Sequence, residues 1–271
     1  MKKLLVIATA FLAVLTLAAC GSKSATTTKT VKIGVVGTDD RIWNAIAKKA
    51  KKQNIKIKLV HFTDYNQPNA ALKQGSIDLN AFQHYYFLDQ WNKSNKGTIK
   101  AIGKTVIAPI RLYGGKGVTS IKGIKKGSQI VIPNDPTNEG RALTLLQTAG
   151  LITLKKAALP TPNDITKNKL NLKIVPVDAS QTARQLSSVS AAIINDSTAQ
   201  DAKLDSKDAI YVEPVNKASK QWINIIAANK KDVNNKTYQK IVKLYQTEAT
   251  KKLLKKYYGN EEIPAWDITL K

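Results

Sequence analysis

The sequence predicts an α/β protein folded into two lobes that are joined by a hinge. Three observations support this prediction. The chain has 271 residues, which is enough for one large domain or for two modest lobes. Its contents of hydrophobic residues (43%) and charged residues (23%) are ordinary for a globular protein. Apolar strands alternate with amphipathic helices along most of the chain, which is typical of a sheet with crossover helices.

The N-terminus carries the pattern of a secretory signal. Lys2 and Lys3 precede an apolar run that ends in LAAC at Cys20. The run is too short for a membrane span and predicts a signal peptide over residues 1–19. LAAC matches the lipobox of bacterial lipoproteins, so we expect Cys20 to carry lipid (diacylglycerol and palmitate). The lipid would anchor the protein at the extracytoplasmic face of the cell membrane, with residues 20–30 as a flexible tether. The alternative is a simple cleaved signal with a coincidental cysteine.

Cysteine content and charge restrict the function classes. Cys20 is the only cysteine, so the chain has no internal disulfide, thiolate metal site or second cysteine nucleophile. The formal net charge is +24. The lysines are spread over amphipathic segments such as AIAKKAKKQN and do not form a stripe with aromatic residues, so we expect no nucleic-acid partner. A solvated basic surface that faces an anionic wall or membrane leaflet explains the charge better.

The first part of the chain predicts three strand-and-helix units. TVKIGVVG is a buried strand, and the helix after it has Ile42, Trp43 and Ile46 in its apolar stripe. NIKIKLVHF alternates before it turns apolar, which predicts a second strand. QPNAALKQG predicts a short helix that ends at Gly75. SIDLNAF predicts the end of a strand, and QHYYFLDQWN begins the next helix.

The remainder continues the alternation. TVIAPIRLYGG predicts a strand that runs into a glycine loop, and SQIVIPND predicts another strand. NEGRALTLLQTAG predicts a helix that stops at Gly150. NLKIVPVDASQTARQL and VSAAIINDSTAQDAKL are two further strand-to-helix units. QWINIIAAN predicts one more apolar strand, and the chain closes with one long amphipathic helix from about Thr237 to Tyr257.

The simplest division of these elements gives two lobes. The first lobe holds residues 31–110 plus 228–271, and the second lobe holds residues 111–227. IAPIRLYG and WINIIAAN are then the two linking strands. Two such crossings make a hinge, and a hinge between two lobes leaves a cleft that can bind a small molecule.

Arg141 is the first candidate for a binding residue. Arginine is rare here; the four arginines are Arg41, Arg111, Arg141 and Arg184. The stretch NDPTNEGRAL predicts the start of a helix, where free N–H groups and the helix dipole favour an anion. An arginine in that turn can form a bidentate pair with a carboxylate, which lysine cannot copy. These residues alone leave an alternative open, namely an exposed arginine without a partner.

Five other polar or aromatic residues are weaker candidates. Asn195 and Asn224 interrupt apolar strands, where an amide is costly unless it is paired. Each is therefore either a ligand-binding group or a satisfied structural asparagine. Tyr65 and Phe82 flank turns, where aromatic residues are more often part of the core. His84 is more often a hydrogen-bonded packing residue than a metal ligand, because no second histidine, cysteine or paired carboxylate lies near it in sequence.

Three stretches together resemble the NlpA/MetQ family of methionine-binding lipoproteins, which are the substrate-binding components of ABC importers. They are FTDYNQPNAALKQGSIDLNAFQHYYFLDQWN, IPNDPTNEGRALTLLQTAGLI and the pair VSAAIIND and WINIIAAN. The resemblance implies a two-lobed, type II periplasmic-binding-protein-like fold with a hinge of two crossover strands. It implies a monomer that binds L-methionine or a close relative between the lobes and delivers it to an ABC permease and its ATPase. It implies no cofactor, no metal and no enzymatic activity.

The resemblance also assigns roles to the polar residues. Arg141 would hold the α-carboxylate of the ligand, and Asn138 would support the same group or the amine. Asn195 and Asn224 would lie on the facing wall and form hydrogen bonds with the α-amino and α-carboxylate groups.

The remaining roles concern the ligand side chain. Tyr65 and Phe82 would line its pocket, and His84 would close that pocket by contact with the thioether region. All of these assignments follow from the resemblance, because spacing alone does not reveal them.

The chain departs from the family pattern at two places. Tyr86 and Phe87 stand where the family usually has Pro and Tyr, so one hydroxyl is absent, and Tyr86 is the candidate to replace it. After Asn195 the family often has a small or amide residue and then an aromatic one, whereas this chain has the run 196–198, Asp-Ser-Thr. We therefore expect the side-chain end of the pocket to be wider or more polar.

These departures keep other ligands open, namely D-methionine, a methionine-containing dipeptide or another apolar amino acid. A surface adhesin or interaction lipoprotein is a further alternative that its charge would suit. An exported enzyme would need a nucleophile with its base or two convergent carboxylates. The sequence has neither G-x-S-x-G nor H-E-x-x-H, which disfavours an enzyme.

Overall fold

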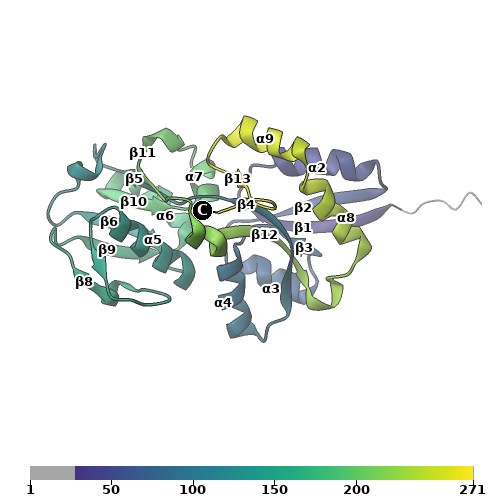
Figure 1. Ribbon diagram of the computed structural model, residues 1–271, viewed down its shortest axis with the longest axis horizontal. Helices are drawn as coiled ribbons and strands as arrows, with labels where there is room; N and C mark the ends of the chain where they lie inside the picture. The colour runs from purple at the N-terminus through teal and green to yellow at the C-terminus, as the bar shows by residue number, and fades with distance from the viewer. Residues whose placement is uncertain (1–27, 271) are drawn as a thin grey trace, which may run out of the picture.

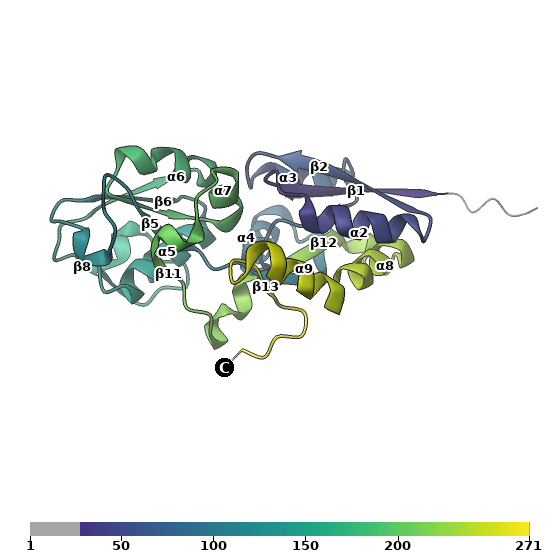
Figure 2. The ribbon, with the colours of Figure 1, turned by 90° about the horizontal axis from the view of Figure 1, so that it is seen from above.

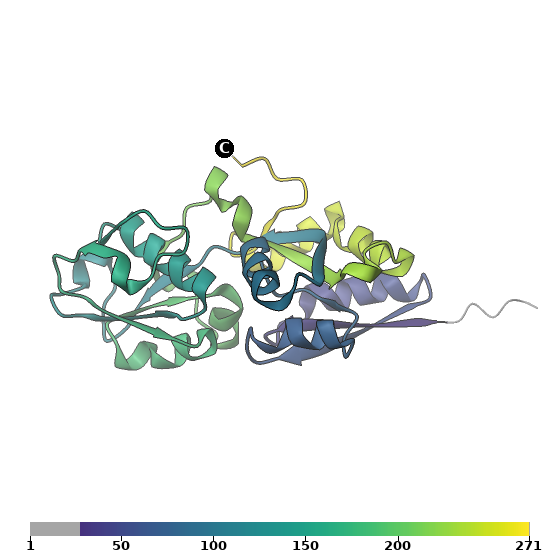
Figure 3. The ribbon, with the colours of Figure 1, turned by 90° about the horizontal axis from the view of Figure 1, so that it is seen from below.

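The computed structural model describes residues 28–270 and shows two α/β lobes side by side (Figure 1). The views from above and from below show that a narrow region joins the lobes (Figures 2 and 3). The predicted signal peptide, the predicted lipidation of Cys20 and most of the predicted tether lie outside the described residues. Between residues 28 and 270, no helix is both long and apolar enough to cross a membrane.

The first lobe is built on a mixed sheet of six strands. In spatial order they are β13 (Ile263–Pro264), β4 (Ile99–Ile107), β12 (Ile223–Asn229), β3 (Leu79–Asn80), β1 (Lys29–Val36) and β2 (Ile55–Phe62). Strands β2 and β3 pair with β1 in parallel, as expected for strands joined by crossover helices. Strand β12 runs antiparallel to both β3 and β4.

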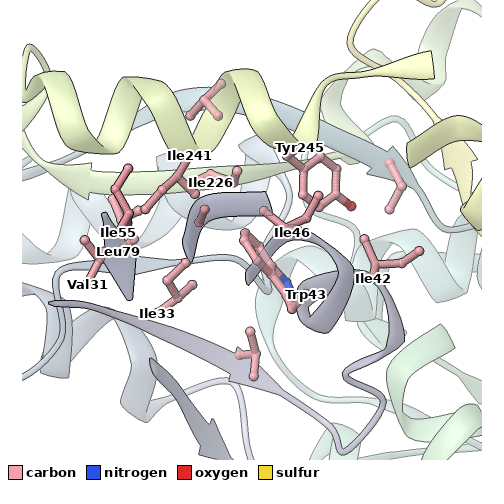
Figure 4. Packing of buried hydrophobic residues seen from close by; sticks show 14 of the residues in the cluster. Val31, Ile33, Ile42, Trp43, Ile46, Ile55, Leu79, Ile226, Ile241 and Tyr245 are labelled. Atoms are coloured by element: carbon pink, nitrogen blue, oxygen red, sulfur yellow. The ribbon is translucent and has the colours of Figure 1, made fainter. Parts of the chain in front are cut away.

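Helices cover both faces of this sheet. They are α2 (Arg41–Lys51), α8 (Lys236–Tyr245) and α9 (Glu248–Tyr258) on one face, and α3 (Gln67–Gln74) and α4 (Tyr85–Asn95) on the other. Successive side chains of β12 point to opposite faces of the sheet and so belong to different hydrophobic layers. Ile226 packs with α2 and α8, whereas Ile225 packs with α3 and α4. Figure 4 shows Trp43 and Tyr245 meeting in the first of these layers, where their ring centroids lie 5.3 Å apart.

The second lobe is built on a five-stranded sheet. In spatial order its strands are β11 (Ala209–Val212), β5 (Arg111–Gly114), β10 (Ala191–Ile194), β6 (Gln129–Pro133) and β9 (Lys173–Val177). Helix α5 (Pro136–Thr148) packs on one face, and α6 (Ala179–Gln185) and α7 (Asp196–Asp201) pack on the other. Strands β7 (Thr153–Leu154) and β8 (Ile165–Lys167) form a small separate hairpin. Short 3₁₀ turns lie at Ile121–Gly123, Pro162–Asp164, Leu186–Ser188, Ser206–Asp208, Lys217–Trp222 and Lys230–Asp232.

The chain changes sheet twice within the described residues. The first change lies between β4 and β5, where Pro109 cannot donate to a strand ladder and the predicted single strand is split in two. The second change lies between β11 and β12. The backbone N–H of Glu213 donates to the carbonyl oxygen of Ile110 across 3.1 Å, so the two crossings lie side by side. This pair of crossings forms the hinge region.

The second crossing differs from the expected one. The sequence division placed residues 111–227 in the second lobe and used WINIIAAN as a linking strand. The structure pairs β12 from Ile223 to Asn229 with β4 of the first lobe, and its last part also pairs with β3, so the crossing is the segment before β12. An apolar strand in sequence does not show which of two sheets it joins. We therefore propose that the first lobe resumes at about Ile223.

The predicted long C-terminal helix is two helices, α8 and α9. The helix breaks at Gln246, whose ψ of 63° is not helical, and its side chain donates to the carbonyl oxygen of Lys104 across 2.9 Å. The side chain of Thr247 then caps α9 by accepting the N–H of Thr250 across 3.2 Å. Because both helices keep their apolar stripes, the break left no trace in the hydrophobic pattern.

Candidate functional site

A cavity of about 160 Å³ lies between the two lobes. This cavity volume is on the order of ten times the volume that one enclosed water molecule needs, so a small solute fits in the cavity. Both lobes contribute to its walls. All seven residues predicted to bind a ligand border it, namely Tyr65, Phe82, His84 and Asn224 from the first lobe and Asn138, Arg141 and Asn195 from the second.

The start of α5 forms one wall of this cavity. Asp135 caps the helix: its Oδ1 accepts the backbone N–H of Asn138 across 3.0 Å and the hydroxyl of Thr137 across 2.9 Å. Its Oδ2 accepts the side-chain Nδ2 of Asn138 across 2.9 Å. The amide of Asn138 is therefore held with its oxygen free to accept other donors. This is the helix start that the sequence predicted.

Arg141 lies one helical turn further along α5 and is only 4% exposed, which excludes the alternative of an exposed arginine without a partner. Its Nε donates to Oε1 of Glu213 across 2.7 Å, and its Nη2 donates to Oε2 of the same carboxylate. The Nη2 group also donates to the carbonyl oxygen of Ala108 across 3.0 Å. The ring of Trp222 lies 4.7 Å from the guanidinium carbon.

The partners of Arg141 leave part of its guanidinium open. An arginine has five N–H donors, and three are used by Glu213 and Ala108. Within residues 28–270, no hydrogen bond engages Nη1, so its two N–H groups have no partner there. The sequence-based prediction missed Glu213, whose only signal is an acidic residue directly after the apolar strand AIYV.

Two side chains meet at the side-chain oxygen of Asn138. Nδ2 of Asn195 donates to Oδ1 of Asn138 across 3.1 Å, and Nε2 of His84 lies 3.4 Å from the same oxygen. Because Nδ1 of His84 accepts the N–H of Phe87 across 3.0 Å, Nε2 carries the proton and acts as the donor. Oδ1 of Asn195 is buried and has no hydrogen-bond partner among the described residues. That oxygen is an unpaired acceptor of a residue that borders the cavity.

His84 is held in its neutral form. Burial lowers the pKa of His84 to about 3, and the positive charge of Arg141 acts in the same direction. The imidazole packs edge-on against Trp222, with ring centroids 4.9 Å apart. His84 is therefore a neutral hydrogen-bond donor and a packing surface. It is not a charged group at physiological pH.

A buried amide triad supports the loop that carries Phe82 and His84. Gln83 is 2% exposed, and its Nε2 donates to Oδ1 of Asn69 across 2.7 Å and to Oδ1 of Asn80 across 2.9 Å. Its Oε1 accepts Nδ2 of Asn69 across 2.8 Å. These bonds tie the loop to β3 and α3, so the two cavity residues on either side of Gln83 have fixed positions.

Aromatic rings form another wall. The ring of Phe82 lies 6.1 Å from that of Tyr65 and 5.7 Å from that of Phe87, between centroids. The hydroxyl of Tyr65 lies 2.9 Å from Oγ of Ser197 in the opposite lobe. Burial raises the pKa of Tyr65 to about 12, so its hydroxyl stays protonated. The hydroxyl of Tyr86 instead donates to the carbonyl oxygen of Ala158, so Tyr86 does not replace the absent hydroxyl at Phe87.

The run Asp-Ser-Thr after Asn195 adds polar groups to the cavity. Asp196 is 7% exposed and pairs with Arg111, whose Nη1 donates to Oδ1 across 3.0 Å. Burial raises the pKa of Asp196, and the positive charge of Arg111 opposes this effect. Gln200 donates to Oδ2 of Asp196 across 2.7 Å. Asp196 is thus engaged within its own lobe, and a side-chain end more polar than usual in the family stays a prediction.

Three residues of one short helix make polar contacts with the opposite lobe. Helix α7 lies at the edge of the second lobe that faces the first (Figures 2 and 3). Ser197 meets Tyr65 at 2.9 Å, and Gln200 donates to Oε1 of Glu262 across 3.2 Å. Oδ1 of Asp201 accepts the hydroxyl of Thr38 across 2.8 Å and its N–H across 2.9 Å. The lobes therefore already touch around the cavity through α7.

Asn224 has a smaller part in this arrangement. Its backbone forms an isolated antiparallel bridge with His84, which joins the start of β12 to the loop before α4. Its side-chain Nδ2 lies 3.5 Å from the carbonyl oxygen of Trp222, a long contact that a ligand could replace. Among residues 28–270, no group of three or more His, Cys, Asp or Glu side chains has the geometry of a metal site.

Two α/β lobes, a double crossing between them and a polar and aromatic cavity at their junction define a two-lobed ligand-binding protein. The family model for the NlpA lipoproteins matches residues 31–266, and the chain belongs to that family. A relative from Vibrio cholerae, named a probable D-methionine-binding lipoprotein MetQ, is 40% identical over 98% of this chain and 98% of its own length.

Solved structures show the same fold. The substrate-binding protein of a methionine transporter from Streptococcus pneumoniae matches with a TM-score of 0.84 and 43% identity, over 88% of this chain and 96% of that one. A nutrient-binding protein from Burkholderia cenocepacia, solved with bound methionine, matches with a TM-score of 0.82 and 40% identity, over 87% and 99%. The two-lobed periplasmic-binding fold that the sequence predicted is thereby confirmed.

Proposed function

We propose that this chain is the lipid-anchored, extracytoplasmic substrate-binding protein of an ABC importer. It binds methionine or a close relative in the cavity between its lobes and delivers the ligand to a permease. One observation carries the proposal: two residues that border this cavity have polar atoms without a hydrogen-bond partner among the described residues, namely Nη1 of Arg141 and the buried Oδ1 of Asn195. A free donor pair and a free acceptor in one small cavity suit the two charged ends of an amino acid.

The carboxylate of the ligand would lie at Nη1 of Arg141, near the first turn of α5. The dipole and N–H groups of a helix start favour an anion there, and the guanidinium adds a charge-assisted hydrogen bond. The ammonium would donate to Oδ1 of Asn195, which is buried without a partner among residues 28–270. Asn138 would fix both neighbours, since its side chain bonds to Asn195 and lies next to His84.

The ligand side chain would lie against the rings of Tyr65, Phe82 and Phe87. A thioether is polarizable and packs well against aromatic faces and edges. Nothing in this wall carries a charge, because the hydroxyl of Tyr65 stays protonated and bonds to Ser197. An apolar side chain is therefore favoured over a charged one.

The names of the relatives support methionine and leave its handedness to experiment. One relative is named for D-methionine, and one solved relative holds methionine. A second class of ligands should also be tested, namely other apolar amino acids and methionine-containing dipeptides. The reasons are the hydroxyl of Ser197 at the aromatic wall and the absence of a hydroxyl at Phe87. The transport role would be the same.

The proposal includes a membrane anchor and transporter partners. The LAAC sequence provides Cys20 for a lipid, which would hold the protein at the outer face of the cell membrane. The partners would be a permease and its ATPase, with the binding protein acting as a monomer. Membership of the NlpA lipoprotein family supports this assignment. We propose no bond-making chemistry, cofactor or nucleic-acid partner.

The test is calorimetric titration of the purified protein with a panel of ligands. The panel contains L- and D-methionine, norleucine, leucine and a methionine-containing dipeptide. We expect the tightest binding for a methionine enantiomer, with weaker binding for ligands that lack the thioether. If no amino acid or dipeptide binds while anionic polymers do, the protein is a surface interaction lipoprotein and the transport proposal fails.

A further inference from the structure

We propose that Glu213 determines the charge of the ligand: by balancing Arg141 inside the cleft, it makes the site select a zwitterion over a simple carboxylate. Glu213 is then a positioning and specificity residue with no direct contact to the ligand. This inference rests on the proposed amino-acid function, because it concerns how the same cavity treats the carboxylate and the ammonium of its ligand.

The geometry makes Glu213 the main anchor of Arg141. The side chains of Arg141 and Glu213 are 3% and 12% exposed, and the carboxylate takes both Nε and Nη2 in a bidentate pair. Oε2 of Glu213 also accepts the N–H of Ile110 across 3.3 Å. The guanidinium is thus bound to both crossings of the hinge, to Ala108 in the first and to Glu213 in the second.

The anchoring also fixes which face of the guanidinium a ligand meets. Glu213 occupies the edge formed by Nε and Nη2, so a ligand carboxylate reaches Nη1 only. A bidentate pair between ligand and arginine, as the sequence suggested, is therefore already taken by a residue of the protein itself. The ligand forms the second carboxylate contact of Arg141, and it meets a charge that is already neutralised.

Among the described residues, the cavity walls hold no second positive charge that could balance the carboxylate of a ligand. Among the described residues that line the cavity, Arg141 is the only arginine or lysine. His84 is neutral, and the nearby Arg111 is paired with Asp196. The carboxyl groups in the lining belong to Asp39, Asp196, Asp201 and Glu262. Asp39 pairs with Arg41, and burial raises the pKa of Glu262, which favours its neutral form.

A carboxylate without an ammonium would therefore add an unbalanced negative charge to a partly buried site. An uncompensated buried charge is costly. A zwitterion brings its own positive charge and supplies a donor to the free oxygen of Asn195. Sites built to bond a ligand N–H reject analogues that lack it by factors of roughly 10⁴ or more.

The experiment compares two ligands that differ only in the α-amino group, methionine and 4-(methylthio)butanoate. Their dissociation constants are measured by calorimetry with the purified protein and its Glu213→Gln variant. The glutamine has nearly the same shape and keeps one acceptor for Arg141, but removes the charge. We expect the wild-type protein to prefer methionine by at least about a hundredfold, and the variant to narrow this ratio by at least about tenfold.

Two further variants separate charge from shape. Glu213→Asp keeps the charge in a shorter side chain, so it should weaken both ligands and retain the wild-type ratio. Glu139→Gln removes a carboxylate from the first turn of α5 that does not pair with Arg141, and it should leave the ratio unchanged. A thermal unfolding curve is measured for each variant as a control that the variant is folded.

The outcomes distinguish the two proposals. If the wild-type protein binds methionine and Glu213→Gln weakens both ligands by the same factor, Glu213 is only structural and this inference is overturned. The same conclusion follows if the wild-type protein binds the two ligands equally well. If the wild-type protein binds no amino acid at all, the proposed function itself fails. Should Glu213→Gln not fold, a retained ratio in Glu213→Asp supports the inference and a collapsed ratio contradicts it.

Discussion

The guanidinium of Arg141 lies against the carboxylate of Glu213, with Nε donating to Oε1 across 2.7 Å. Arg141 belongs to α5 of the second lobe, whereas Glu213 lies in the crossing that returns the chain to the first lobe. The residue proposed to hold the ligand is therefore attached directly to the segment that must bend when the lobes move. One ion pair therefore links the proposed ligand-binding arginine to the hinge.

This ion pair predicts a large effect on stability. Glu213→Ala leaves a buried guanidinium without its partner, and breaking a buried pair in this way costs about 3–5 kcal/mol. We expect the free energy of unfolding to fall by about 3 kcal/mol, because Ala108 and Trp222 still contact the guanidinium. Urea denaturation of the variant and the wild type provides the measurement. A loss of less than about 1 kcal/mol would show that the pair is worth no more than an exposed one.

The hydroxyl contact between Tyr65 and Ser197 predicts an effect on ligand release. Tyr65→Phe removes a hydrogen bond that joins the lobes across the cavity. A bond of this kind contributes about 0.5–1.5 kcal/mol, so we expect affinity to fall about three- to tenfold, mainly through faster dissociation. Stopped-flow fluorescence with methionine measures the rate. The matched control is Tyr211→Phe, which removes a hydroxyl contact to Thr148 within the second lobe and should leave dissociation unchanged.

His84 predicts a defined pH dependence of stability. Its pKa is about 3 in the folded protein and about 6.5 when unfolded, so the unfolded chain binds more protons between these values. Stability from this group is complete above about pH 6.5 and is lost as the pH falls toward 3, by up to about 1.4 kcal/mol per pH unit. Burial raises the pKa of Asp196 and Glu262, so these groups act in the opposite sense over a pH range that overlaps the range of His84 and extends above it.

The contribution of His84 is therefore isolated by difference. The free energy of unfolding is measured against pH for the wild type and for His84→Gln, which keeps a donor but cannot titrate. The difference curve should fall with decreasing pH below about 6.5 and be flat above it. A difference curve that is flat over the whole pH range would mean that His84 has the same pKa in the folded protein as in the unfolded chain. Affinity for methionine should not change through His84 between about pH 5 and pH 8.

Much of the fold was predictable because hydrophobic periodicity and turn residues are local signals. Gly75 ends α3 in the left-handed conformation, with a φ of 79°, as the sequence predicted. The sheet that β12 joins depends on strands far away in sequence, so the apolar residues of β12 alone could not show to which lobe the strand belongs. The break at Gln246 depends on a contact with Lys104, which is equally distant.

The site shows the same division. The helix start at Asp135 was predictable from its capping residues, and the roles of Asn138 and Asn195 came from family resemblance. Glu213 was not found, because a single acidic residue after a strand is no signal until Arg141 is seen beside it. The neutral state of His84 is likewise a product of burial, which no local pattern of residues shows.

The assignment of Arg141 to the ligand carboxylate is tested most directly by titrating Arg141→Ala with methionine. Arg141 is the only arginine or lysine among the described residues that line the cavity, so its loss would leave the bound carboxylate without a cationic partner there. We expect the dissociation constant to rise well over tenfold. Arg184→Ala, which removes an exposed arginine from α6 of the same lobe, should bind like the wild type. Unchanged affinity in a folded Arg141→Ala protein would contradict the account.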